Sequence, residues 1–354
     1  MISIQQIRDS QNKIIVLGNS DPIVQSILDF DYLSGKKEGS IVGIVTGRRG
    51  FAKMFYGKNE VLIPTLSGVS STGDLAKGQV VSSGSDLLGT NYWFLNLLSG
   101  RRTLSSTLEV LSLAEDSLQG LTLKEVPNPQ NQRREGQTLS GFVGGSLFAE
   151  NVPELHSLKI IESNKKLIVG PASVGLLVPG ALKLGPIGGI TPDQIIEGKI
   201  TEPGSVAVMS ASGGMTNELM SVATLAGHKL SFALSFGGDR FPVLSPRDAF
   251  LLAESDPATK TVLYYGELGG EDEYELVKLK EEGKFTKNVI AHIAGTVASL
   301  FAESPQFGHA KAKADKEKTT ATAKRAALKS AGFQVSNSFT EFIDLVGARR
   351  GSPV

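Results

Sequence analysis

The sequence contains no cysteine. Disulfide bonds, thiolate zinc sites and cysteine nucleophiles are therefore excluded. Export to an oxidising compartment gains no support from such a composition, and we expect a cytoplasmic protein.

An excess of charge of either sign is also missing, because 36 basic residues balance 36 acidic ones. This balance offers no general electrostatic attraction to nucleic acid or to a membrane surface, and we expect neither as a partner. No segment has the roughly 18 uninterrupted apolar residues that a membrane-spanning helix needs, and the first residues lack the apolar core of a signal peptide. We therefore expect a soluble protein whose binding sites are local features.

Short apolar runs alternate with segments of helical periodicity along the whole chain. This pattern is typical of parallel sheets with crossover helices, and a length of 354 residues favours two domains. In the first half, strands are expected at residues 13–18, 40–47, 61–66 and 93–98. In the second half, they are expected at residues 166–171, 205–210, 230–238, 261–268, 288–295 and 333–338. The sequence thus predicts two doubly wound α/β units.

A polar, proline-bearing stretch at residues 127–141 has no periodicity and predicts a surface insertion, which we place at about residues 119–145. The domain boundary is expected at the segment GPASVG, between residues 169 and 170. In open parallel sheets, ligands lie beyond the carboxyl ends of the strands, where helix N-termini offer free N–H groups. Functional residues are therefore expected in the turns between strands and helices.

Two such turns of the first half are suited to a phosphate of a cofactor such as coenzyme A (CoA). Gly18 and Asn19 follow the first strand at a helix start, but the GxGxxG spacing that admits a dinucleotide is absent. An ordinary strand-to-helix connection explains this turn equally well. Arg48 follows the second strand, where its guanidinium suits a phosphate and a basic surface loop is the equal alternative.

In the second half, Ser212, Gly213 and Gly214 follow a strand and open a helix, which makes a set of N–H donors for a phosphate. The alternative for Ser212 is a plain N-cap. Glu267 lies near the end of the strand expected at 261–268, where a carboxylate is suited to orient an imidazole. Its alternative is to cap the next helix with the acidic residues that follow.

His309 is one of four histidines and lies in an aperiodic segment. An imidazole that a carboxylate holds at one nitrogen is a competent phosphoryl acceptor at the other, although a lone histidine is more often structural. His156 and His292, in a helix pattern and a strand pattern, are interpreted as structural. The basic residues after His309 have helical spacing around an alanine-rich face and are expected on a solvated helix: Lys311, Lys313, Lys316, Lys318, Lys324, Arg325 and Lys329.

The order of these segments resembles the alpha subunit of succinyl-CoA synthetase and, more closely, the corresponding region of ATP-citrate lyase. The resemblance covers nearly the whole chain. It rests on LDFDY (28–32), LIP (62–64), AENVPE (149–154), GPASVG (170–175), PGSVAVMSASGGMTNEL (203–219), GGDRFP (237–242), GELGG (266–270) and FGHA (307–310). It implies a Rossmann-like CoA-binding domain over residues 1–169 and a flavodoxin-like ligase domain over residues 170–354.

The activity that this resemblance implies is that of an acid–CoA ligase. His309 would be phosphorylated by ATP or GTP, a carboxylate substrate would receive the phosphoryl group, and the thiol of CoA would attack the resulting acyl phosphate. Glu267 is implied as the hydrogen-bond partner of His309, and Glu150 as another acidic residue of the site. The phosphate is expected at Ser212, Gly213 and Gly214, and CoA at Gly18, Asn19, Arg48, Ser99 and Arg101.

ATP and Mg²⁺ are expected mainly on an ATP-grasp large subunit, with which the chain would form a hetero-oligomer, and no metal ligand is expected in this chain. Because the sequence stops before a lyase domain could begin, the expected reaction is that of citryl-CoA synthetases of the reductive TCA cycle: citrate, CoA and ATP give citryl-CoA, ADP and phosphate. Alternatives are a succinyl-CoA synthetase subunit, an ATP-citrate lyase-type subunit and a non-catalytic CoA-binding paralogue.

Two positions depart from the family pattern. Lys311 stands where the family usually has glycine, as in GHAGA, and its side chain would change the loop geometry or supply a compensating charge. The first strand ends in GNSD rather than in the glycine-rich turn of succinyl-CoA synthetase, which favours the branch of ATP-citrate lyase.

Overall fold

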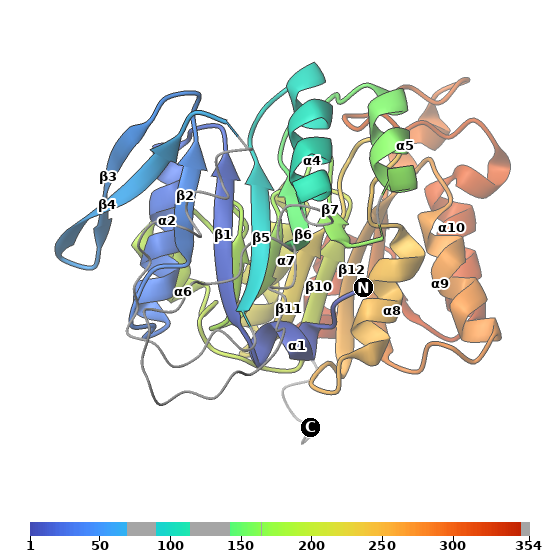
Figure 1. Cartoon of the computed structure of the whole chain (residues 1–354). Coiled ribbons are helices and arrows are strands. Elements are labelled where there is room, and N and C mark those ends of the chain that lie inside the picture. Colours follow the sequence, from blue (N-terminus) through green and yellow to red (C-terminus); the bar gives the residue numbers. More distant parts are fainter. Residues whose placement is uncertain (69–89, 114–141, 164, 348–354) are drawn as a thin grey trace, which may run out of the picture.

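The computed structural model describes residues 1–68, 90–113, 142–163 and 165–347. These residues form two sheets of mostly parallel strands with helices packed around them, which confirms the predicted α/β fold of a Rossmann-like unit followed by a ligase unit (Figure 1). Most of the expected insertion lies outside the described residues. Residues 142–145, which were expected within it, instead begin a strand. Within the described ranges, no helix is long and apolar enough to cross a membrane.

The first sheet has the strand order β3-β4-β2-β1-β5-β6-β7. Its strands are β1 (Gln11–Leu17), β2 (Ile41–Val45), β3 (Gly50–Tyr56), β4 (Asn59–Leu66), β5 (Thr90–Asn96), β6 (Phe142–Leu147) and β7 (Leu167–Val169). Its helices are α1 (Ile4–Arg8), α2 (Asp21–Leu33), α4 (Arg101–Leu113) and α5 (Glu154–Ser163). Two expectations are corrected here. The run at 61–66 is the second strand of an antiparallel β3–β4 hairpin, and the run at 166–171 forms β7, which pairs with β6 of the first sheet.

The second sheet has the order β14-β13-β12-β10-β11-β8-β9, in which β8 pairs antiparallel with both of its neighbours. Its strands are β8 (Leu176–Val178), β9 (Leu182–Leu184), β10 (Val206–Ser210), β11 (Leu230–Ser235), β12 (Thr261–Glu267), β13 (Asn288–Ala294) and β14 (Gln334–Ser336). Its helices are α6 (Pro192–Glu197), α7 (Gly213–Leu225), α8 (Pro246–Ser255), α9 (Asp272–Glu281), α10 (Ala321–Ser330) and α11 (Phe339–Gly347), with short 3₁₀ turns η2 (Thr296–Leu300) and η3 (Glu317–Thr319).

The central strands are buried because helices cover both faces of each sheet, and this explains why they read as unbroken apolar runs. In β10 and β11 every residue is buried. One apolar cluster continues from the first sheet into the second and includes both Trp93 and Phe232. The two units therefore share a packed core, and their loops are held in one arrangement.

The expectation of a single solvated basic helix after His309 is wrong. The helix α10 begins only at Ala321, so Lys311 lies in a loop. The side chain of Lys324 is 1% exposed and pairs with Glu273, at 2.6 Å, which is also buried. Burying a lysine is tolerated only when its charge is paired, and this pairing cannot be read from helical spacing.

Candidate functional site

The site is built from loops that follow the carboxyl ends of strands. In Figure 1 the arrowheads of β1, β2 and β5 point to the same side of the molecule, as expected for parallel neighbours. Glu267 is the last residue of β12, which lies between β10 and β13. Its position is set by the hydrogen bond from Leu268 N to Ala294 O (3.0 Å) and by the ammonium of Lys324, which donates to the carbonyl of Glu267 (2.8 Å).

His309 meets Glu267 at this edge. Its Nδ1 lies 2.8 Å from Oε1 of Glu267, the contact that the family resemblance implies. The hydrogen bond to Glu267 raises the pKa of His309 above its usual value, and the charge of Glu150 adds to this, while burial and the charge of Lys311 oppose it. With the Nδ1 proton held by the carboxylate, the neutral imidazole presents the lone pair of Nε2 as a nucleophile.

Gly238 makes room for this imidazole. A Cβ atom at Gly238 would lie 2.4 Å from Cδ2 and 2.8 Å from Nε2 of His309. Real Cβ atoms do not approach other atoms so closely, so any side chain here would displace the ring. The glycine is therefore required by packing against His309, because its backbone has no positive φ that would by itself demand glycine.

Asp239 is a residue of the site that sequence reasoning missed. Its two carboxylate oxygens accept the backbone N–H groups of Asn151 (3.2 Å) and Val152 (3.0 Å). Burial raises the pKa of Asp239, and the negative charge of the exposed Glu150 also acts on it. Asp239 thus joins the loop of the first sheet that carries Glu150 to the loop of the second sheet that touches His309. The only sequence signal was its place in the segment GGDRFP.

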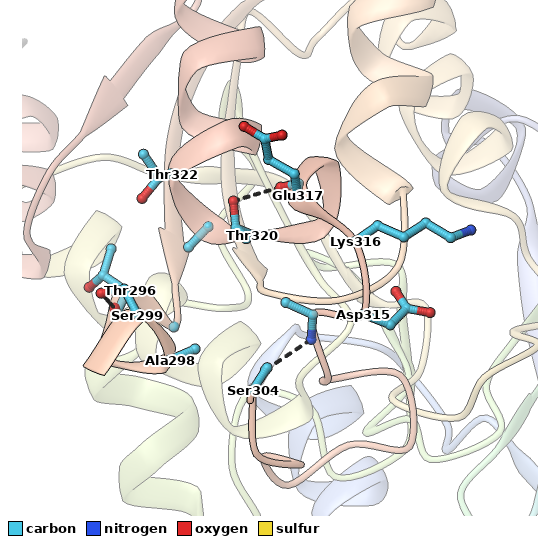
Figure 2. A pocket seen from close by; sticks show the side chains of 12 residues that line it. Thr296, Ala298, Ser299, Ser304, Asp315, Lys316, Glu317, Thr320 and Thr322 are labelled. Carbon is cyan, nitrogen blue, oxygen red and sulfur yellow. Dashed lines mark hydrogen bonds between the residues drawn. The ribbon is translucent and has the colours of Figure 1, made fainter. Parts of the chain in front are cut away.

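The loop that carries His309 is closed at its base. Ser304 Oγ accepts the N–H of Ala314 (3.1 Å), which Figure 2 shows beside a pocket of about 290 Å³. Inside the loop, Phe307 N donates to Ala312 O at 2.9 Å. Gly269 packs so closely on this loop that a Cβ there would lie 1.9 Å from the carbonyl oxygen of Lys311. These contacts hold His309 over the end of β12.

The helix start expected to face a phosphate opens α7. Ser212 is its N-cap and accepts the N–H of Met215 at 3.4 Å, so the structure shows the capping role that was the alternative. A Cβ at Gly213 would lie 2.5 Å from Cγ1 of Val174, which explains that glycine by packing. Gly214 is exposed and borders open space, and N–H groups in the first turn of a helix have no partner within the helix.

Most of the residues expected to bind CoA follow three neighbouring strands. Gly18 and Asn19 follow β1, Arg48 follows β2 and Ser99 follows β5, and these strands are adjacent in the order β2-β1-β5. Asn19, Arg48 and Ser99 are exposed, so each is accessible to a ligand at this edge. Arg101 begins α4, but its side chain lies outside the described part of the chain.

Asn96 shapes the turn that carries Ser99, and sequence reasoning also missed it. Its fully buried side chain donates to the carbonyl of Thr103 (3.2 Å) and the hydroxyl of Ser106 (2.9 Å), and it accepts the N–H of Leu98 (3.0 Å). Because Thr103 and Ser106 belong to α4, these buried hydrogen bonds fix the conformation of the turn between β5 and this helix. No local pattern distinguishes such an asparagine from an ordinary strand residue.

Two of the other histidines, His292 and His228, make structural contacts. His292 is buried in β13, its Nδ1 lies 2.9 Å from Ser336 Oγ, and burial lowers its pKa to about 4. His228 contacts the carbonyl of Val346 at 3.0 Å, and His156 lies within α5. Among these residues, none is placed beside the carboxylates that surround His309.

The chain is similar to known CoA ligases and ATP-citrate synthases. Residues 209–333 match the CoA-ligase family. ATP-citrate synthase beta chain protein 1 of Arabidopsis thaliana is 35% identical over 320 residues, which cover 89% of this chain and 46% of the plant protein. The ATP-citrate synthase of Homo sapiens is 32% identical over 339 residues, covering 94% of this chain and 27% of the human protein. The chain thus spans about half the length of the plant relative and about a quarter of the human one.

Solved structures agree with this likeness. ATP citrate lyase from Methanothrix soehngenii, in complex with citrate and coenzyme A, has a TM-score of 0.81 and 31% identity over 96% of this chain and 49% of that chain. The acetyl-coenzyme A synthetase 1 of Ca. Korarchaeum cryptofilum has a TM-score of 0.61 at 16% identity, covers 100% of this chain and 64% of that chain, and shares the fold alone.

Proposed function

The chain belongs to the CoA-ligase superfamily that includes the ATP-citrate synthases, and from this premise we propose that it is the phosphohistidine-carrying, CoA-binding subunit of an ATP-dependent citrate–CoA ligase. The observation that carries the proposal is the pair of His309 and Glu267, with 2.8 Å between Nδ1 and Oε1 and with Nε2 left as the nucleophile. In this proposal residues 1–169 bind CoA and residues 170–354 carry the phosphoryl group.

In the first half-reaction, Nε2 of His309 attacks the γ-phosphorus of ATP. An N–P bond forms, the bond to the β,γ-bridging oxygen breaks, and ADP leaves. The imidazole becomes cationic, and Glu267 stabilises that charge through Nδ1. The first-turn N–H groups of Gly213 and Gly214 are proposed to bind the phosphoryl oxygens, because a helix start favours an anion.

In the second half-reaction, a carboxylate oxygen of the substrate attacks the phosphorus, and the N–P bond breaks to restore neutral His309. The thiolate of CoA then attacks the acyl carbon, a C–S bond forms and phosphate leaves. Glu150 is proposed to accept the thiol proton, a role supported by its electrostatic effect on His309 and by the hydrogen bonds that join its loop to Asp239. CoA would lie across the turns of Gly18, Arg48 and Ser99.

Nucleotide and Mg²⁺ are proposed to reside on an ATP-grasp partner subunit. The likeness to an ATP citrate lyase that was solved with citrate and CoA supports citrate as the acid. Succinate is the rival that the same site chemistry would accept.

The proposal is tested by phosphate labelling. The chain is mixed with its ATP-grasp partner and γ-labelled ATP, and acid-labile, alkali-stable label is measured on this chain. His309→Asn is the test variant and His292→Asn the matched histidine control. Citrate or succinate, each with CoA, is then added as a chaser.

We expect label on the wild type and on His292→Asn but not on His309→Asn, with discharge by citrate plus CoA. If succinate plus CoA discharges the label and citrate plus CoA does not, succinate rather than citrate is the substrate. A wild type that binds its partner and takes no label would refute the catalytic function and leave a CoA-binding scaffold.

A further inference from the structure

Lys311 follows His309 by two residues, and its side chain is largely shielded from solvent. Its side chain is 8% exposed, its Nζ contacts Oδ2 of Asp272, and it lies 5.3 Å from the ring centroid of Phe236. Phe236 follows β11 and precedes by two residues the Gly238 that packs on the His309 ring. The ammonium and the imidazole therefore lie against the same short segment, 236–238.

Neither Asp272 nor Phe236 requires a lysine for the fold. Asp272 is the first residue of α9, where the helix dipole already stabilises a carboxylate, and its side chain remains 20% exposed. A buried ammonium costs free energy of desolvation that a single carboxylate and one ring face only partly offset. Lys311 also lies in a loop whose backbone hydrogen bonds, such as Phe307 N to Ala312 O, do not use its side chain.

Phosphorylation changes the charge around this ammonium. Three carboxylates interact with His309: Glu267 of β12 through a hydrogen bond, and Glu150 of the loop after β6 and Asp239 of the loop after β11 through their charges. A phosphoryl group adds between one and two further negative charges near neutral pH. In a partly buried site such charges need a cation within reach. Lys311 has a flexible four-carbon stem and acts on the same imidazole electrostatically.

We propose that Lys311 binds the phosphoryl group of phosphorylated His309, its ammonium moving from Asp272 to a phosphoryl oxygen. Asp272 and Phe236 hold the ammonium ready while the imidazole is free. After transfer to the carboxylate substrate, the ammonium returns to Asp272. This inference rests on the proposed phosphorylation of His309 and adds a residue that touches the transferred group.

If Lys311 binds the phosphoryl group, replacing Lys311 should change the pKa of that group. The complete chain is phosphorylated chemically with potassium phosphoramidate, which requires no ATP, partner or carboxylic acid. The His309 signal is identified in the ³¹P NMR spectrum as the one that His309→Asn lacks. Its chemical shift is then followed against pH in the wild type, Lys311→Met and Lys311→Arg. Lys313→Met is the control, because Lys313 is an exposed lysine of the same loop and its replacement removes the same charge.

A bound ammonium stabilises the dianion, so we expect Lys311→Met to raise the second phosphoryl pKa by about one unit, a tenfold change in proton affinity. In Lys311→Arg the second phosphoryl pKa is expected to stay near its wild-type value, and in Lys313→Met it is expected to be unchanged. Equal pKa values in Lys311→Met and the wild type, an equal rise in both methionine variants, or no His309-dependent signal would overturn the proposal. Failure of the ATP-labelling experiment with a normal ³¹P titration would instead reject the proposed function alone.

Discussion

Replacing Glu267 by glutamine should slow phosphorylation of His309 while leaving the fold intact. The Nδ1–Oε1 distance of 2.8 Å is that of a charge-assisted hydrogen bond, and the imidazole becomes cationic when Nε2 accepts the phosphoryl group. A hydrogen bond to a charged group contributes about 1.5–3 kcal/mol. At about 1.4 kcal/mol for each factor of ten, its loss in the transition state slows the step roughly 10- to 150-fold.

The pH dependence of the phosphorylation rate provides a second, independent test of the role of Glu267. Because Glu267 raises the pKa of His309, the Glu267→Gln variant should have a lower imidazole pKa, and the acid limb of its rate profile should move to lower pH. Rapid-quench measurement of phosphohistidine formation from labelled ATP, with the partner subunit present, gives both quantities. Glu281→Gln, an exposed carboxylate at the end of α9, is the control. Slowing of less than threefold, or an acid limb that does not move, would refute the role assigned to Glu267.

Two further perturbations test the packing around the site, and a third tests a buried lysine elsewhere in the fold. Gly238→Ala should fold with a near-native urea midpoint yet lose most phosphohistidine formation, since its Cβ displaces the His309 ring. Asp239→Asn should lower the unfolding free energy by about 1–3 kcal/mol, because one N–H of the Glu150 loop loses its acceptor. Lys183 has a pKa of about 7 through burial, below the 10.5 of an exposed lysine, so the unfolded chain binds more protons between these values. The unfolding free energy of the wild type, measured in urea relative to that of Lys183→Met, should therefore rise by about 1.4 kcal/mol per pH unit from pH 7 to 10. A difference in unfolding free energy that does not change with pH would contradict the lowered pKa of Lys183.

The parallel strands at the centres of both sheets could be predicted because burial on two faces leaves a continuous apolar run. The runs at 205–210 and 261–268 correspond to β10 and β12, with ends that differ by a residue or so. The short edge strands β7 and β14 lie within the predicted runs at 166–171 and 333–338, but β3, β8 and β9 were missed. β8 and β9 have three residues each, which is too short to show a period, and β3 pairs only with its hairpin neighbour.

The sequence by itself determined the chemistry that is available: no thiol, one histidine in a glycine-flanked loop, and carboxylates and glycines at the ends of apolar runs. Those features depend on residue type and local spacing, so they are readable along the chain. The tertiary structure decided which of these groups meet. Glu267 and His309 are 42 residues apart, Asp239 lies 88 residues from the Asn151 N–H that it binds, and the buried Lys324 meets a strand end 57 residues away. Such pairs form because parallel strands bring their carboxyl ends to one edge, and the charge of each group depends on burial that only the packed fold creates.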